Sequence, residues 1–192
     1  MNPDKDTFAM TALKKIAVLL APVWLAACSL MPPADFPVED QVDIDRYMGK
    51  WYVIAHIPPS ATENAYNSIE RYEQTEPGTI ETTFTYREGG FDGEQQTMHP
   101  VGSVLEGTNN AVWAMRFYWV LRMQYVISYV DDDYQTTIVA RDKRDYVWIM
   151  ARTPQIDDAT YDSLVEKVAD YGYDISKLRK VPQQPLDERN DG

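Results

Sequence analysis

Cysteine and histidine are nearly absent from this sequence. Its 192 residues include one cysteine, Cys28, and two histidines, His56 and His99. A lone cysteine cannot form a disulfide within the chain, so the fold has to be stable through packing alone. Neither histidine belongs to a Ser/His/Asp, Cys/His or His-Glu-x-x-His arrangement, which argues against hydrolytic and zinc chemistry. The sequence therefore indicates a protein that is not an enzyme and that uses no metal or other cofactor.

Positive charge is also scarce. The chain has 18 Lys and Arg residues against 30 Asp and Glu residues, a formal net charge of −12. Such a surface repels a phosphate backbone, so nucleic acid is excluded as an expected partner. The longest apolar run, near the N-terminus, is shorter than the roughly 20 residues that a membrane-spanning helix needs. The 44% of hydrophobic residues is still enough for the core of one medium-sized domain.

The N-terminus has the features of a secretory signal. Lys14 and Lys15 precede an apolar run that ends in the small residues Leu25-Ala26-Ala27-Cys28. The last four residues resemble the lipobox of bacterial lipoproteins, which implies that Cys28 carries a diacylglyceryl group. Ser29 rather than aspartate follows it, which implies sorting to the outer membrane. An ordinary cleaved signal and an uncleaved anchor are the less favoured alternatives.

These features divide the chain into four expected segments. Residues 1–27 are expected to form a lipoprotein signal peptide, and residues 28–42, which contain three prolines, a lipidated tether. Residues 43–183 are expected to form a β-barrel with one helix, and residues 184–192 a polar tail.

Short alternating runs separated by turn residues predict eight β-strands, with no helical run between them. An antiparallel meander leaves two unpaired edges unless the sheet closes on itself. We therefore expect an all-β fold, an eight-stranded antiparallel up-and-down β-barrel. The interior of such a barrel is either filled by its own side chains or holds one small ligand. The predicted strands are 51–57, 68–74, 79–87, 95–104, 111–117, 125–130, 134–141 and 146–152.

One amphipathic helix is predicted after the last strand. Apolar residues recur at i, i+3, i+4 and i+7 from Tyr161 to Val168. Asp157 or Asp158 can cap the start, and Gly172 fits just past the end. The narrow apolar stripe favours packing on the outside of the barrel.

Several motifs resemble the signatures of lipocalins. These are a Gly-x-Trp at the first strand, a Tyr and an Asp-x-x-Tyr across a later hairpin, and an arginine that ends the last strand. Residues 46–52 and 144–154 resemble the bacterial outer-membrane lipoprotein lipocalins and their apolipoprotein D relatives, and the resemblance runs from Val42 to Gln183. It implies that Trp51 closes one end of the barrel beneath the Arg152 guanidinium. The signature residues are Gly49, Trp51, Asp131, Tyr134 and Arg152.

Alternation along the strands places an aromatic and aliphatic set inside the barrel. The resemblance implies that this set binds a fatty acid or a lysophospholipid in a protein anchored in the bacterial outer membrane and facing the periplasm. The cavity residues expected on this basis are Val53, Ala55, Phe84, Tyr86, Tyr125, Ile127, Tyr129, Tyr146, Trp148 and Met150.

Two other functions stay open at this point. The side chains can instead fill the barrel, in which case the apolar segment Phe117–Leu121 would dock a protein, a homodimer included. A lipid-modifying enzyme on the same fold is the less favoured alternative.

Overall fold

The computed structural model describes residues 30–117 and 121–189. The expected signal peptide and Cys28 lie outside the described residues, as does the middle of the Phe117–Leu121 segment, residues 118–120. Within the described ranges, neither α-helix has the length and apolar character that crossing a membrane requires.

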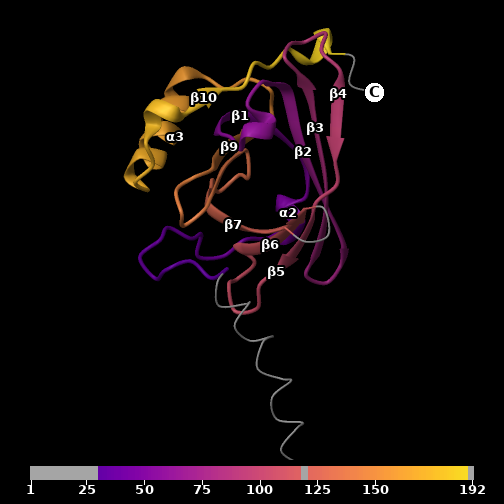
Figure 1. Ribbon diagram of the computed structural model, residues 1–192. Coiled ribbons are helices and arrows are strands. Elements are labelled where there is room, and N and C mark those ends of the chain that lie inside the picture. Colours follow the sequence, from indigo (N-terminus) through magenta and orange to yellow (C-terminus); the bar gives the residue numbers. More distant parts are fainter. Residues whose placement is uncertain (1–29, 118–120, 190–192) are drawn as a thin grey trace, which may run out of the picture. The chain divides into compact units, whose positions relative to one another are not determined.

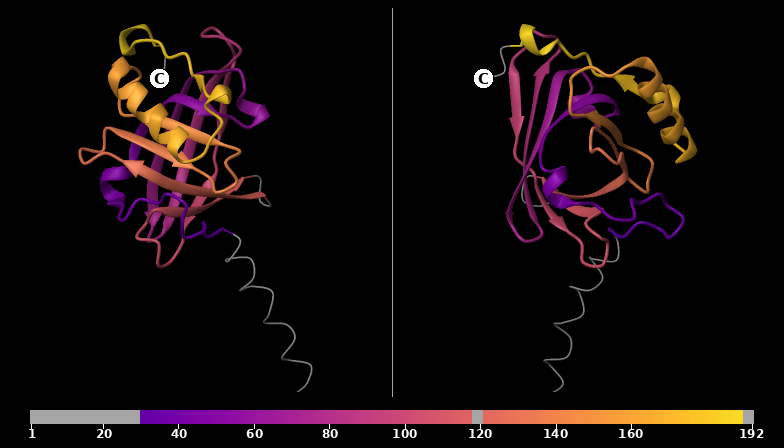
Figure 2. Two further views of the ribbon diagram at one scale, coloured as in Figure 1. Left: turned by 90° about the vertical axis from the view of Figure 1, so that its left-hand side faces the viewer. Right: turned by 180° about the vertical axis from the view of Figure 1, so that it is seen from behind.

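Ten strands form one antiparallel sheet that closes into a barrel (Figure 1). The strands pair in the order β10-β1-β2-β3-β5-β6-β7-β8-β9, with β4 also pairing β3. β1 also pairs with β9, which closes the sheet (the right-hand view in Figure 2). The strands are β1 (Gly49–Ile57), β2 (Ala65–Glu76), β3 (Thr79–Glu88), β4 (Gln95–Met98), β5 (Val101–Val104), β6 (Val112–Phe117), β7 (Leu121–Val130), β8 (Thr136–Ala140), β9 (Val147–Ala151) and β10 (Arg179–Lys180).

The closed barrel has the eight positions that the sequence predicts. β4 and β5 both pair with β3 and are separated only by His99 and Pro100, so together they make one predicted strand. Proline cannot donate a ladder hydrogen bond, which explains the interruption. The two-residue β10 pairs with the outer edge of β1 near Ala55 and is not part of the closed ring. The prediction of an eight-stranded antiparallel barrel is confirmed.

The predicted external helix is α3 (Asp158–Asp170). The Asp157 carboxylate accepts a hydrogen bond from the Thr160 backbone N–H and caps the helix start. Leu164 and Val168 are buried against outward-facing residues of the barrel. Figure 1 shows α3 outside the ring of strands.

Four shorter helical segments complete the fold. The helix α2 (Ile44–Tyr47), which the sequence analysis missed, is capped by Asp43 and leads into β1. Single 3-10 turns lie at η1 (Ser60–Thr62), η2 (Ile175–Lys177) and η3 (Leu186–Glu188).

The segment before the barrel is more closely packed than a tether. Phe36 and Val42 are buried, and the Glu39 N–H donates to the Ile127 carbonyl oxygen. Residues from Phe36 onward are therefore part of the packed domain rather than of the tether expected over residues 28–42, because their apolar side chains belong to the core.

Candidate functional site

One end of the barrel is closed by Trp51 and Arg152. The guanidinium carbon of Arg152 lies 3.7 Å from the centroid of the Trp51 ring. The guanidinium also donates to the carbonyl oxygens of Arg46, Lys50 and Tyr134 at 2.6, 2.9 and 3.2 Å. A planar fork can stack on an indole and donate at its edge at the same time, which a lysine ammonium cannot. These contacts hold the start of β1 against Arg152, the residue that follows β9.

A layer of aromatic rings fills the barrel next to this plug. The rings of Trp113 and Tyr125 stack with centroids 4.9 Å apart, and Tyr47 contacts Trp51 at 5.1 Å. The Tyr125 hydroxyl donates to the Tyr72 hydroxyl at 2.8 Å. Burial raises the pKa of Tyr47 to about 12 and holds the pKa of the other two tyrosines well above their usual value. The layer is therefore neutral at physiological pH and leaves no room for a ligand.

An interior cavity lies on the open side of this layer. Its volume is about 40 Å³, which holds a group of a few atoms, whereas small-molecule pockets have roughly 300 Å³ or more. Three methionines line it, and their flexible thioether side chains can adapt to ligands of irregular shape. An alkyl chain can enter only if these side chains move. The lining residues are Glu70, Tyr72, Pro100, Met115, Phe117, Met123, Gln124, Tyr125, Trp148 and Met150.

Seven of the ten expected cavity residues belong to the interior cluster of the barrel or pack against it. They are Val53, Phe84, Tyr86, Tyr125, Ile127, Trp148 and Met150. Of these, Tyr125, Trp148 and Met150 line the cavity itself.

The inward placement of Ala55 and Tyr129 is wrong. The strand register shifts between Val53 and Ala55, and again between Ile127 and Tyr129. Such an irregularity adds one residue to a strand and reverses the faces that follow it. Ala55 consequently belongs to the outer cluster, and the Tyr129 ring lies 4.6 Å from the Lys167 ammonium of α3.

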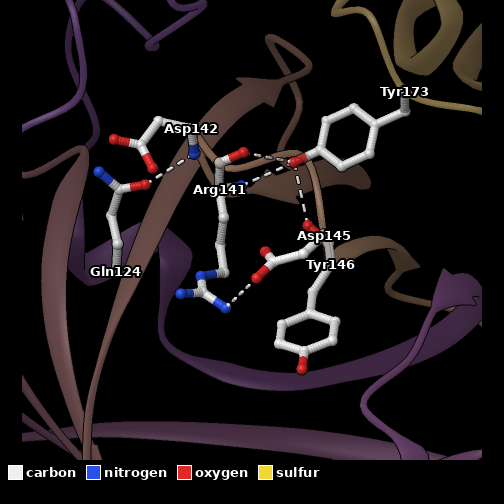
Figure 3. A network of polar contacts seen from close by, with 6 residues as sticks. All are labelled: Gln124, Arg141, Asp142, Asp145, Tyr146 and Tyr173. Carbon is white, nitrogen blue, oxygen red and sulfur yellow. Dashed lines mark hydrogen bonds and ion pairs between the residues drawn. The ribbon is translucent and has the colours of Figure 1, made fainter.

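Tyr146, the tenth expected cavity residue, belongs to a polar network at the open end (Figure 3). The Arg141 guanidinium lies 5.1 Å from its ring and donates to the Asp145 carboxylate at 3.0 Å. The Tyr173 hydroxyl reaches in from the segment after α3, accepts from the Arg141 N–H and donates to a backbone oxygen. This network ties the loop between β8 and β9 to the C-terminal segment.

The sequence analysis missed one interior residue with distinctive chemistry, Glu70. Its register partners are Trp51 on β1 and Phe84 on β3, both of which point inward. Burial in the barrel raises the pKa of the Glu70 carboxyl to about 8. Residues 70–76 of its strand include four acidic or amide side chains, so composition alone did not show which of them faces inward.

The described residues contain no group of three or more His, Cys, Asp or Glu side chains that could hold a metal ion. Asp131 instead accepts hydrogen bonds from the N–H groups of Asp133 and Gln135 in the turn between β7 and β8. His56 is buried, and burial, with the nearby Arg179 charge, lowers its pKa to about 4. Neither feature brings a nucleophile and a base together.

A closed eight-stranded antiparallel barrel with a helix outside it and an arginine over the entrance tryptophan defines the lipocalin class. The model of the lipocalin-like domain family matches residues 42–183. The chain belongs to the lipocalin family, which confirms the resemblance found in the sequence.

Relatives and solved structures agree with this assignment. Temperature-induced lipocalin-1 of Arabidopsis thaliana is 33% identical over 74% of this chain and 80% of its own length. Outer membrane lipoprotein Blc of Vibrio cholerae is 25% identical over 90% of this chain and 100% of its own length. Apolipoprotein D of Bos taurus is 26% identical over 77% of this chain and 80% of its own length. Insecticyanin of Manduca sexta has the same fold, with a TM-score of 0.61 at 15% identity over 81% of this chain and 93% of that one.

Proposed function

We propose that this protein binds a small hydrophobic or amphipathic ligand in the open half of its barrel. The observation that carries this proposal is the position of the cavity, which three methionines and Trp148 surround on the open side of a rigid aromatic layer. Thioether chains can rearrange around a guest, whereas the packed rings below them cannot. Fatty acids and lysophospholipids are the ligand classes that we favour, and binding rather than catalysis is the activity.

The relatives support an envelope location for this activity. We include in this proposal the cleavage of residues 1–27 and the acylation of Cys28, and both regions lie outside the described residues. The sequence Leu25-Ala26-Ala27-Cys28 and the similarity to the outer membrane lipoprotein of Vibrio cholerae support a lipid-anchored protein of the bacterial outer membrane that faces the periplasm. Replacing Cys28 by serine should release the protein from membranes, and retention in the membrane fraction would contradict the anchor.

Native mass spectrometry of the chain from Ser29 onward, after mild purification, tests the ligand proposal. We expect a bound mass that contains an acyl or alkyl chain, and we expect Trp148→Arg and Met150→Arg to lose it. Ile175→Arg, at an exposed position outside the barrel, is the matched control and should keep it. Circular dichroism has to show that each variant is folded.

The small volume of the cavity favours one second candidate. If the barrel stays filled, the protein would act through an interface that includes the exposed Leu121, either with another protein or as a homodimer. An empty wild-type barrel, with association that Leu121→Ser abolishes, would support this candidate over ligand binding.

A further inference from the structure

A half-buried carboxyl group forms part of the cavity wall. Glu70 shares its face of β2 with Tyr72, and both line the cavity together with Met115 and Met150. The accessible surface that Glu70 retains therefore faces the inside of the barrel. An acidic side chain at this depth is costly unless something inside the barrel compensates it.

The protein itself supplies no partner for this carboxyl. Within residues 30–117 and 121–189, neither a hydrogen bond nor an ion pair reaches Glu70. On the adjacent strand, the Thr82 hydroxyl is buried on the same interior face, since Thr82 is the register partner of Tyr72, and it also lacks a hydrogen-bond partner. Buried polar groups in proteins are almost always paired. The Glu70 carboxyl, which is open to the cavity, and the buried Thr82 hydroxyl beside it therefore keep hydrogen-bonding capacity that a guest molecule can use.

Among the described residues that line the cavity, Glu70 is the one carboxyl group. Tyr72 on β2 and Tyr125 on β7 are neutral, because burial holds the pKa of each hydroxyl well above its usual value. Two arginines of the barrel are engaged elsewhere: Arg152 stacks on Trp51, and Arg141 pairs with Asp145. His56 on β1 is neutral at physiological pH, because burial lowers its pKa to about 4.

These surroundings discriminate between polar head groups. A carboxylate that reached Glu70 would meet a group of its own charge wherever Glu70 is ionised, and could pair with it only while Glu70 keeps its proton. A protonated amine supplies both the opposite charge and the hydrogen-bond donors that a carboxylate needs. Its terminal group of a few atoms also fits the 40 Å³ of free volume without displacement of the aromatic layer.

We propose that Glu70 is the recognition group of this barrel and binds the protonated amine of an amphipathic ligand, whose apolar chain lies along Met115, Met123 and Met150. This inference rests on the proposed function and names the chemical class of the ligand. The fatty acid favoured above would have to enter with its methyl end first when Glu70 is ionised, since the two carboxylates then repel each other.

Binding of an amine is coupled to the proton on Glu70. Burial raises the pKa of this carboxyl to about 8, so it is mostly protonated at pH 7 in the empty barrel. Pairing with an ammonium group requires the ionised form, and binding therefore releases a proton. Affinity should rise about tenfold between pH 7 and pH 9, as long as the amine remains protonated.

Calorimetric titration with three probes of equal chain length tests the proposal: dodecylamine, dodecanol and laurate. At pH 8 we expect dodecylamine to bind at least about tenfold more tightly than dodecanol. Glu70→Gln should abolish this preference and keep dodecanol binding within about twofold. Glu73→Gln, at an exposed position of the same strand, should behave as the wild type.

Titrations of the wild type at pH 7 in buffers of different ionisation enthalpy give a second readout that needs no variant. Release of close to one proton per dodecylamine supports the pairing, and no release overturns it. Equal binding of all three probes in the wild type and in Glu70→Gln overturns the role of Glu70 but leaves ligand binding intact. If none of the probes binds, both the proposed function and this inference fail.

Discussion

The two halves of the barrel interior are built from similar residues but packed in opposite ways. In the closed half, the rings of Tyr47, Trp51 and Trp113 are fully buried and contact one another, and their polar atoms are paired. In the open half, methionines surround a small cavity and the Glu70 carboxyl has no partner. The difference suggests that stability is concentrated at one end of the barrel, whereas the other end keeps the freedom to rearrange.

Truncation of one tryptophan in each half should show this difference most strongly. Trp51→Ala removes a fully buried ring and should lower the free energy of unfolding by about 4 kcal/mol. Trp148→Ala, at a partly exposed position on the cavity wall, should cost about 1 kcal/mol. Urea unfolding of both variants measures the contrast, and equal losses would show that the two halves are packed equally well.

The unpaired carboxyl of the open half should make stability depend on pH. The pKa of Glu70 is raised to about 8 in the folded chain from an ordinary 4.5, so between these values the folded state binds more protons than the unfolded state. Stability should therefore fall as pH rises, by about 3 kcal/mol between pH 5 and pH 8. Glu70→Gln should remove this contribution. If wild type and Glu70→Gln have the same pH profile, the carboxyl is not desolvated as the structure indicates.

The Arg152 guanidinium is expected to make the next largest contribution to the stability of the closed half. Arg152→Lys keeps the charge but loses the planar stack on Trp51 and two of the three bonds to carbonyl oxygens. We expect a loss of about 2 kcal/mol in thermal or urea unfolding. Arg116→Lys, on an exposed position of β6, is the control and should change stability by less than about 0.5 kcal/mol.

The smallest effect on stability is expected for the methionines. Met150→Leu conserves volume and should cost less than about 1.5 kcal/mol. The branched leucine side chain is stiffer than methionine, so the variant should bind fewer members of a series of alkyl probes of different length and branching than the wild type does. An unchanged binding profile would mean that Met150 does not adapt to the guest.

Much of this architecture could be predicted from the sequence. Alternation and turn residues predicted the strands, and the Gly-x-Trp and terminal arginine motifs predicted which strands meet. The periodicity from Tyr161 to Val168, with its aspartate cap, predicted α3.

The details of the site could not be predicted in the same way. Alternation failed after Val53 and after Ile127, because irregularities in the pairing reverse the faces and leave no mark in composition. Glu70 was missed because its inward orientation follows from its pairing with Trp51 and Phe84, which the sequence of a polar strand does not reveal. The cavity volume depends on how long side chains from many strands interlock, which no single segment encodes.

The central claim is that the open half of the barrel rearranges around a ligand while the closed half stays fixed. The most direct measurement is an NMR titration with dodecylamine of protein labelled at the methionine methyl groups and the tryptophan indole N–H groups. We expect the methyl signals of Met115, Met123 and Met150 to shift, and the indole signals of Trp51 and Trp113 to stay in place. Unchanged methyl signals, or shifts of equal size at both ends, would contradict the account.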